Sequence, residues 1–481
     1  MTIVKQIQVR FINRWAAIGS IIHRPPASPL AWNSLDTEVK KHAHWPLAGL
    51  LVVFVILALI YSIFLPLGES ADEVSHFALV RFIAEQKRPP LSIQEREAVG
   101  KKGDASPLYH ALVALLTQHV NVASLRTLPL QAEPRRYIPF DAARTNMIFH
   151  TEDETFPFRG IVLAWHLGRL TSIPLGVITL LGIYLTVLSI YPHRPYLALA
   201  ATGFAAFIPS FVINSSVIND DNLAVPLVTL SVYFMVRVLQ SDNRRRTLII
   251  LGGLIGLAAI TKYHGLVLLF EVTLALMVLA WYFKWPWRQL VTRWAWVMGS
   301  FVVAAGWWFV FLFWRFNQIA ELGLVAGLLA PMGDPVITAS AGGFVPLQSI
   351  YWLEWIEPLF QTFWVVYGNT QVFAPKFVYQ IIIVPTLITI LGLTCLGHNL
   401  LKTRHRWSPI RFDIALLALH GLVYLAIVFV RFQTHPTVVG AQGRHLFPAL
   451  VSIAFFSVLG LSAFWKNNDT NSKPLKSLLE G

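Results

Sequence analysis

The sequence contains a single cysteine, Cys395, among its 481 residues. One cysteine cannot form an internal disulfide, and it excludes zinc and iron–sulfur sites that are built from several thiolates. Cys395 lies inside an apolar run, where we expect it to pack as a small hydrophobic side chain. Charged residues are also scarce, at 13% of the chain, against about 25% in typical soluble domains. A disulfide-rich scaffold and an ordinary soluble domain are therefore both excluded.

Apolar residues, by contrast, are abundant: they make up 55% of the chain, and the mean hydropathy is +0.58. Runs of about 20 apolar residues are long enough to cross a bilayer as helices. A membrane β-barrel would alternate polar and apolar residues instead. We therefore predict an all-α polytopic membrane protein with about ten transmembrane helices, at 46–66, 169–191, 195–213, 223–240, 247–261, 264–283, 295–313, 378–397, 413–431 and 446–465.

Lysine and arginine gather in alternate connections between these runs, at 242–246, 284–293 and 402–411. Short basic loops favour the cytoplasmic side of a membrane. We therefore expect a plasma (inner) membrane protein with cytoplasmic tails at 1–45 and 466–481 around a membrane domain at 46–465. About 45 mostly polar residues precede the first run, so it is expected to be a signal anchor rather than a cleaved signal peptide. The same topology argues against a nucleic-acid partner, despite the net charge of +13.

Two long connections, 67–165 and 314–377, then lie on the external side. The segments 71–86 and 106–120 predict amphipathic helices on the membrane surface. The aromatic segment 347–368 carries Glu354 and Glu357, and we predict that it lies at the interface or re-enters the membrane. If it spanned, the number of helices would change.

The first of these connections begins with Asp72, Glu73 and His76, within about one helical turn. Asp72 and His76 are four residues apart and share a face, whereas Glu73 points about 100° away. One carboxylate could act as a general base while its neighbour orients it. Alternatively, both carboxylates could stabilise a solvated helix N-terminus that Ser70 caps.

Other polar residues also fall at the external ends of the predicted spans. Asn219 and Asp220 could bind sugar hydroxyls or an acceptor, or could form a solvated turn in which Asp221 caps the next helix. The basic residues at these ends could bind a phosphate, or could anchor the protein at the interface; they are Lys262, Arg431, Arg444 and His445. Gly443 would permit a close approach of two backbones. Together these residues predict one external cavity.

The pattern HExxH and comparable zinc spacings do not occur. We expect that no cofactor is required. A divalent cation held by Asp72, Glu73, His76 or Asp220 remains an alternative.

The stretches "ADEVSHFALVRFIAEQKRPP", "ASPLYHAL", "GRLTSIPLGV", "SSVINDDNL" and "AQGRHLFPAL" occur in this order over most of the chain. They resemble the GT-C class of membrane glycosyltransferases, which includes protein O-mannosyltransferases and lipid A aminoarabinose transferases. They are most similar to a bacterial GT-C-like family with D-E-x-x-H and Q-G-R motifs. The chain departs from that pattern at Ala71 and Ser106, where proline is usual, and at His445, where tyrosine is usual.

This resemblance implies a GT-C fold and a sugar donor linked to polyprenyl phosphate. It also implies inverting transfer, on the external face, of a hexose or pentose to an unidentified lipid, glycan or protein. Asp72 would be the general base, with Glu73 and His76 beside it. Lys262, Arg431, Arg444 and His445 would bind the donor phosphate, and Tyr109, Asn219 and Asp220 the sugar or acceptor. The alternatives are a transporter or flippase for an anionic lipid-linked substrate, and a non-catalytic assembly protein.

Overall fold

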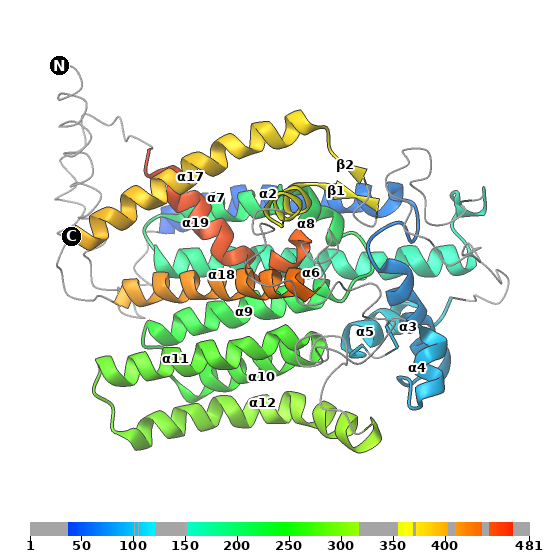
Figure 1. Cartoon of the computed structure of the whole chain (residues 1–481), viewed down its shortest axis with the longest axis horizontal. Coiled ribbons are helices and arrows are strands. Elements are labelled where there is room, and N and C mark those ends of the chain that lie inside the picture. The colour runs from blue at the N-terminus through cyan, green and yellow to red at the C-terminus, as the bar shows by residue number, and fades with distance from the viewer. Residues whose placement is uncertain are drawn as a thin grey trace.

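The computed structural model describes residues 37–100, 102–103, 105–120, 150, 152–316, 355–368, 372–402, 409–434 and 442–464. Within these residues the chain is almost entirely helical, as predicted. The helices of the bundle run roughly along one direction (Figure 1). They are α2 (Thr37–Phe64), α6 (Gly160–Ile190), α7 (Pro195–Ala206), α9 (Asp221–Leu239), α10 (Arg245–Thr261), α11 (Val267–Tyr282), α12 (Trp287–Phe316), α17 (Lys376–Lys402), α18 (Pro409–Thr434) and α19 (Leu450–Ser462).

Eight helical stretches in the described chain are long and apolar enough to cross a membrane, two fewer than the sequence predicts. The predicted span 195–213 is divided into α7 and the short α8 (Pro209–Asn214), because the chain leaves the helix at Phe207 and restarts at Pro209. The predicted span 247–261 corresponds to α10, which has 17 residues. Both segments are helical and apolar as expected, but shorter than a typical span.

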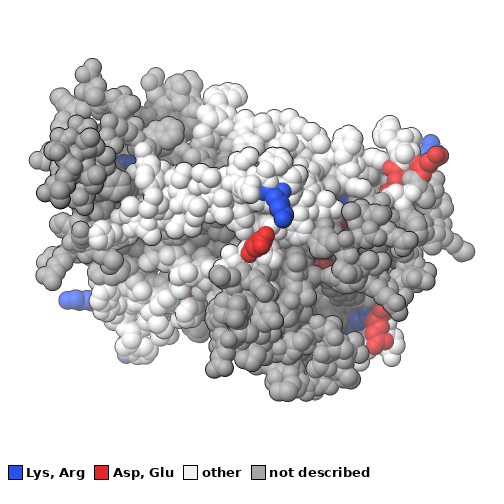
Figure 2. Space-filling model, turned by 45° about the horizontal axis from the view of Figure 1, so that its top comes forward, with Lys and Arg blue, Asp and Glu red and all other residues white. Residues whose placement is uncertain are grey.

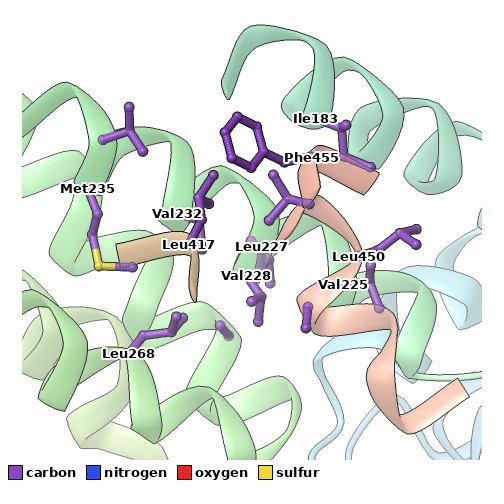
Figure 3. Packing of buried hydrophobic residues seen from close by; sticks show 14 of the residues in the cluster. Ile183, Val225, Leu227, Val228, Val232, Met235, Leu268, Leu417, Leu450 and Phe455 are labelled. Carbon is purple, nitrogen blue, oxygen red and sulfur yellow. The ribbon is translucent and has the colours of Figure 1, made fainter. Parts of the chain in front are cut away.

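Helix α9 lies in the hydrophobic core and packs against α6, α10 and α18; part of this core is shown in Figure 3. Its Val225, Val228 and Val232 are buried against side chains such as Ile183 and Phe455. The outer helices expose large apolar side chains instead, and Trp314 of α12 is 88% exposed. The described residues in the view of Figure 2 likewise carry few charged side chains. Such a surface is suited to lipid.

Three shorter helices cover one end of the bundle (Figure 1): α3 (Glu73–Gln86), α4 (Ile93–Val99) and α5 (Leu108–Thr117). Helices α3 and α5 confirm that the segments 71–86 and 106–120 are largely helical, as predicted. They share a second apolar core with α6 and the chain before α9, in which Phe77 stacks on Trp165 at 4.2 Å and Tyr109 packs near Ile218. This core holds α3 rigidly against the end of the bundle.

The remaining elements lie between the long helices. The 3-10 turns are η3 (Glu152–Glu154), η4 (Tyr263–Leu266) and η6 (Gly443–Ala449), and a two-residue antiparallel pair joins β1 (Val366–Tyr367) to β2 (Val372–Phe373). The described part of the segment 347–368 forms α15 (Ile356–Trp364), whose nine residues are too short to span. Glu354 lies outside the described residues, as do most of the N-terminal tail and the whole C-terminal tail.

Candidate functional site

The predicted polar residues meet at the end of the bundle that α3 and α5 cover. Asp72 precedes α3, Asp220 and Asp221 begin α9, Lys262 joins α10 to η4, and Arg444 lies in η6. These residues are far apart in sequence, yet ion pairs connect them. The fold therefore brings together the carboxylates and cations that were predicted to line one cavity.

Asp72 forms an ion pair with Arg444, whose Nη2 lies 2.6 Å from the Asp72 Oδ2 atom. Arg444 also donates to the backbone carbonyl of Ala71 at 3.3 Å and to the side-chain oxygen of Gln442 at 2.6 Å. The backbone of Asp72 is left-handed, with φ 62°, and its side chain makes no capping hydrogen bond to α3. A non-glycine residue in this region is strained. The N-cap residue of α3 is therefore Asp72 and not Ser70, and its carboxylate is held by Arg444.

Lys262 is held between two carboxylates at the start of α9. Its Nζ atom lies 2.8 Å from Asp220 and 2.6 Å from Asp221. Burial would lower the pKa of Lys262, but the two carboxylates outweigh it and raise the pKa. Burial would likewise raise the pKa of Asp220, yet Lys262 and Lys102 hold it well below its usual range. Lys262 and Asp220 are thus both charged at neutral pH.

Glu73 points into the protein, away from Asp72, and forms a fully buried ion pair with Arg169 of α6. The two Glu73 oxygens accept from Arg169 at 2.7 Å each, and also from the backbone N–H groups of Gly68 and Ile218. Arg169 donates its remaining protons to backbone carbonyls at the end of α2. Glu73 therefore fixes α3 to α2, α6 and the chain before α9.

His76 follows Asp72 by one turn of α3 and faces His110 of α5. Its Nδ1 lies 2.9 Å from His110 Nε2, and the two rings stack. His110 Nδ1 donates to the backbone carbonyl of Ser106 at 3.0 Å. Burial lowers the pKa of His110 to about 4, and burial together with Lys102 lowers the pKa of His76 well below its usual value. Both rings are therefore neutral.

Tyr109 and Asn219 are buried and use their polar atoms inside the protein. The Tyr109 hydroxyl pairs with Ser172 at 2.8 Å and accepts the Asn219 N–H at 3.2 Å. The Asn219 side chain accepts from Asp221 N–H and donates to Ala71. These contacts fix the turn before α9 beside Asp72. Their predicted role in binding sugar or acceptor stays a prediction.

Two further basic residues complete the cluster. Arg431 lies near the end of α18, close enough to Arg444, Asp72 and Asp221 to interact with them electrostatically, and His445 follows Arg444 in η6. The three carboxylates Asp72, Asp220 and Asp221 thus face the three cations Lys262, Arg431 and Arg444. A cavity of about 60 Å³ adjoins Arg444, between Ala71, Asn214 and Tyr367.

The model of the dolichyl-phosphate-mannose-protein mannosyltransferase family matches residues 165–314. This match supports the GT-C class of membrane glycosyltransferases. Among solved structures, apo Archaeoglobus fulgidus oligosaccharyltransferase is similar, with 12% identity and a TM-score of 0.46. The alignment covers 86% of this chain and 50% of that protein, so the chain spans about half of its length. No curated protein matches the sequence.

Two further residues near the site, Arg169 and His110, lie in stretches that resemble the GT-C class but were not predicted as site residues. Arg169 belongs to the quoted motif "GRLTSIPLGV", and a lone arginine within an apolar span was a signal of a buried partner. His110 follows Tyr109 in "ASPLYHAL" and lies opposite His76 only because α3 and α5 pack together. Sequence spacing cannot show that contact.

Proposed function

We propose that this protein transfers a sugar from a polyprenyl-phosphate-linked donor to an acceptor hydroxyl, on the external side of the plasma (inner) membrane and with inversion. The description of the matching family names a lipid-phosphate-linked sugar donor, and the chain brings Lys262 and Arg444 together with carboxylates where its long helices end. The observation that carries the proposal is the Asp72–Arg444 ion pair beside the cavity.

Arg444 is the proposed ligand of the donor phosphate. A guanidinium can bind a phosphate through two parallel hydrogen bonds, which a lysine ammonium cannot reproduce. In the present structure the same guanidinium holds the Asp72 carboxylate. An arriving phosphate competes with Asp72 for Arg444, because both are anions that use the same donors. Donor binding would therefore release Asp72 from its ion pair.

Asp72, once released, is the proposed general base. It accepts the proton of the acceptor hydroxyl while that oxygen attacks the anomeric carbon from the side opposite the phosphate. The carbon–oxygen bond to the phosphate breaks, and the polyprenyl phosphate leaves with the electron pair. Arg444, with Lys262 and Arg431 nearby, stabilises the charge on the departing phosphate. A single displacement of this kind inverts the anomeric configuration.

The position of the charges favours this proposal over a transporter. Transporter sites lie near the middle of the membrane, on interrupted helices. Here Asp221 begins α9, Lys262 follows the end of α10, and Arg444 precedes α19. The charged groups thus gather where helices end, under α3 and α5.

The proposal is tested by measuring sugar transfer from defined polyprenyl-phosphate sugars in membranes that contain the protein. Asp72→Asn keeps the shape of the side chain but cannot accept a proton, so transfer should fall by about 10²–10⁴-fold. Donor binding should survive. Glu85→Gln is the matched control, because Glu85 lies on the same helix in an exposed pair with Arg81, and it should retain normal transfer.

Full transferase activity in Asp72→Asn would contradict the assignment of the base. A wild-type protein that binds the donor but transfers no sugar to any acceptor, and moves the lipid across the membrane instead, would favour the flippase alternative.

A further inference from the structure

Three lone-pair ligands converge beneath the Asp72–Arg444 pair, from three different elements. His76 of α3, His110 of α5 and Asp220 before α9 are all buried, and one ligand atom from each lies within 4.8 Å of the others. We propose that His76, His110 and Asp220 bind a divalent transition-metal ion of the zinc type.

The protons available to this cluster are too few for its acceptors. His110 donates from Nδ1 to Ser106, which leaves Nε2 as a lone-pair acceptor for the His76 Nδ1–H. His76 Nε2 then has no proton, and this fully buried atom has no hydrogen-bond partner. It faces another acceptor, the Asp220 Oδ1 atom, at 3.8 Å. A cation bound to His76 Nε2 and Asp220 Oδ1 removes this conflict, and His110 would join it through Nε2, which then no longer accepts the His76 Nδ1–H.

The separation of the ligand atoms also fits one ion. Zinc bonds to histidine nitrogen and carboxylate oxygen are about 2.0–2.2 Å long. Two ligands on one ion therefore lie about 3–4 Å apart, and the 3.8 Å between His76 Nε2 and Asp220 falls in that range. Two imidazoles with one carboxylate suit zinc or iron better than calcium or magnesium.

The surroundings prepare these residues for a metal. A metal-bound histidine usually donates its other N–H to a backbone carbonyl or carboxylate, as His110 does to Ser106. Metal binding requires neutral imidazole and ionised carboxylate. The His110–Ser106 hydrogen bond fixes the tautomer in which His110 Nε2 carries no proton, and the Lys262 ammonium 2.8 Å from Asp220 favours the ionised carboxylate.

Lys262 is the natural competitor of the ion, because it lies 2.8 Å from the same Asp220 oxygen. It has a second partner in Asp221 at 2.6 Å. When Asp220 turns to the ion, Lys262 keeps one carboxylate and loses the other. This step rests on the proposed function: an ion at this place would make Lys262 a stronger ligand for the donor phosphate.

The test is the metal content of the full-length protein purified in detergent, stripped with chelator and reloaded with Zn²⁺. We expect about one zinc per chain by elemental analysis, and a cobalt-substituted form with the visible absorption bands of a nitrogen- and oxygen-bound site. His76→Gln and Asp220→Asn should each weaken zinc binding more than tenfold. His119→Ala, at an exposed histidine just beyond α5, should bind as the wild type does.

Wild-type protein that retains no more zinc than Asp220→Asn overturns the proposal, and so does zinc that survives both ligand changes. Should His76→Gln fail to fold, Asp220→Asn and the cobalt spectrum of the wild type still decide the question. Metal content is measured without any transfer assay, so the metal site and the transferase proposal can fail separately.

Discussion

At the scale of single residues, Asp72 combines a strained backbone with a functional side chain. Its φ of 62° is a conformation that asparagine and aspartate tolerate better than other side chains do. Strain of this kind persists where surrounding contacts hold it, and here the contacts are the ion pair to Arg444 and the Asn219 bond to Ala71. The strained position coincides with the carboxylate that the sequence predicts as the base.

Asp72→Ala should therefore be less stable than Asp72→Asn. Both variants lose the ion pair, but only alanine must adopt a left-handed backbone without a polar side chain, which costs about 1–2 kcal/mol. Thermal unfolding of the two purified variants measures the difference. Equal melting temperatures would mean that the backbone at position 72 is not held in this conformation.

Glu73 should matter for folding far more than its exposed neighbours do. Glu73→Gln leaves Arg169 buried without a countercharge, and breaking a buried pair in this way typically costs about 3–5 kcal/mol. We expect poor yield and a large fall in melting temperature. Glu85→Gln is again the control, since its exposed pair should contribute at most about 1 kcal/mol. A stable Glu73→Gln protein with no transferase activity would instead make Glu73 the base.

Arg444 should contribute to donor affinity through its planar fork. Arg444→Ala should weaken the binding of a polyprenyl-phosphate sugar by about 1.5–3 kcal/mol, the usual cost of losing a hydrogen bond to a charged group. Arg444→Lys should restore only part of it. Equilibrium binding to the purified variants, with melting temperature as a check on folding, measures both. Normal donor binding by a folded alanine variant would remove Arg444 from the phosphate site.

The residues of the site were predictable to different degrees. Asp72, Lys262 and Arg444 lie at the edges of apolar runs. Burying a charged side chain in a membrane is energetically unfavourable, so charges at these positions predicted a functional role. In the sequence Glu73 lies beside Asp72, on another face of the helix, and either carboxylate could be the base or its orienting neighbour. Its separate role depends on Arg169, which lies 96 positions away, and no local pattern shows that partner.

At the scale of elements, η6 carries Arg444 and is held from two sides. Gly443 lies against α15, and its N–H donates to the Thr362 hydroxyl at 2.7 Å. Pro448 accepts from His420 of α18 at 3.1 Å, and the other nitrogen of His420 lies 2.9 Å from Glu271 of α11. His420 thus links η6 to α11 through α18. These contacts fix the position of η6 and therefore of Arg444.

Gly443→Ala should displace η6, because a Cβ atom there would lie 2.1 Å from the backbone nitrogen of Phe363. Backbone cannot move aside as a flexible side chain can, so we expect lower stability and weaker donor binding through Arg444. This close approach confirms the prediction made for Gly443. The matched control is Gly253→Ala in α10, where a Cβ meets nothing within 4 Å. That change should be neutral or stabilise by about 0.5–1 kcal/mol. A Gly443→Ala protein with wild-type stability and donor affinity would contradict the argument.

Element boundaries were predicted less well than element types. Helices α3 and α5 followed from amphipathic patterns. Helix α4 was not predicted, because it is short and the capping box between Ser92 and Glu95 is its main local signal. The break between α7 and α8 coincides with Pro209, because proline is favoured in the first turn of a helix and removes a hydrogen bond from a helix interior. A hydropathy profile averages over many residues, so it does not show such a break.

At the scale of the whole molecule, composition alone established a helical membrane protein, because a helix satisfies its own backbone in lipid. The packing of α9 against α6, α10 and α18 could not be predicted from hydropathy. Hydropathy shows that a helix is apolar, but not which other apolar helix it contacts. The position of the site at one end was nevertheless predictable. Charged residues at alternate span ends must meet on one side if the helices alternate in direction.

The last prediction is that the end of the bundle with the Asp72–Arg444 pair faces the external side of the membrane. The single cysteine of the chain makes this prediction testable by cysteine labelling. Replacing Cys395 with serine gives a cysteine-free background, because the chain has no other cysteine. Glu97→Cys places a thiol on exposed α4 beside the site, and Asn243→Cys places one in the turn between α9 and α10. The 19 residues of α9 separate these two ends by about 28 Å, nearly a full bilayer core. The turn at 242–246 is basic, which favours the cytoplasm. An impermeant maleimide should therefore label Glu97→Cys in intact cells, and Asn243→Cys only after permeabilisation. The reverse pattern would place the Asp72–Arg444 pair on the cytoplasmic side, where the proposed external transfer could not occur.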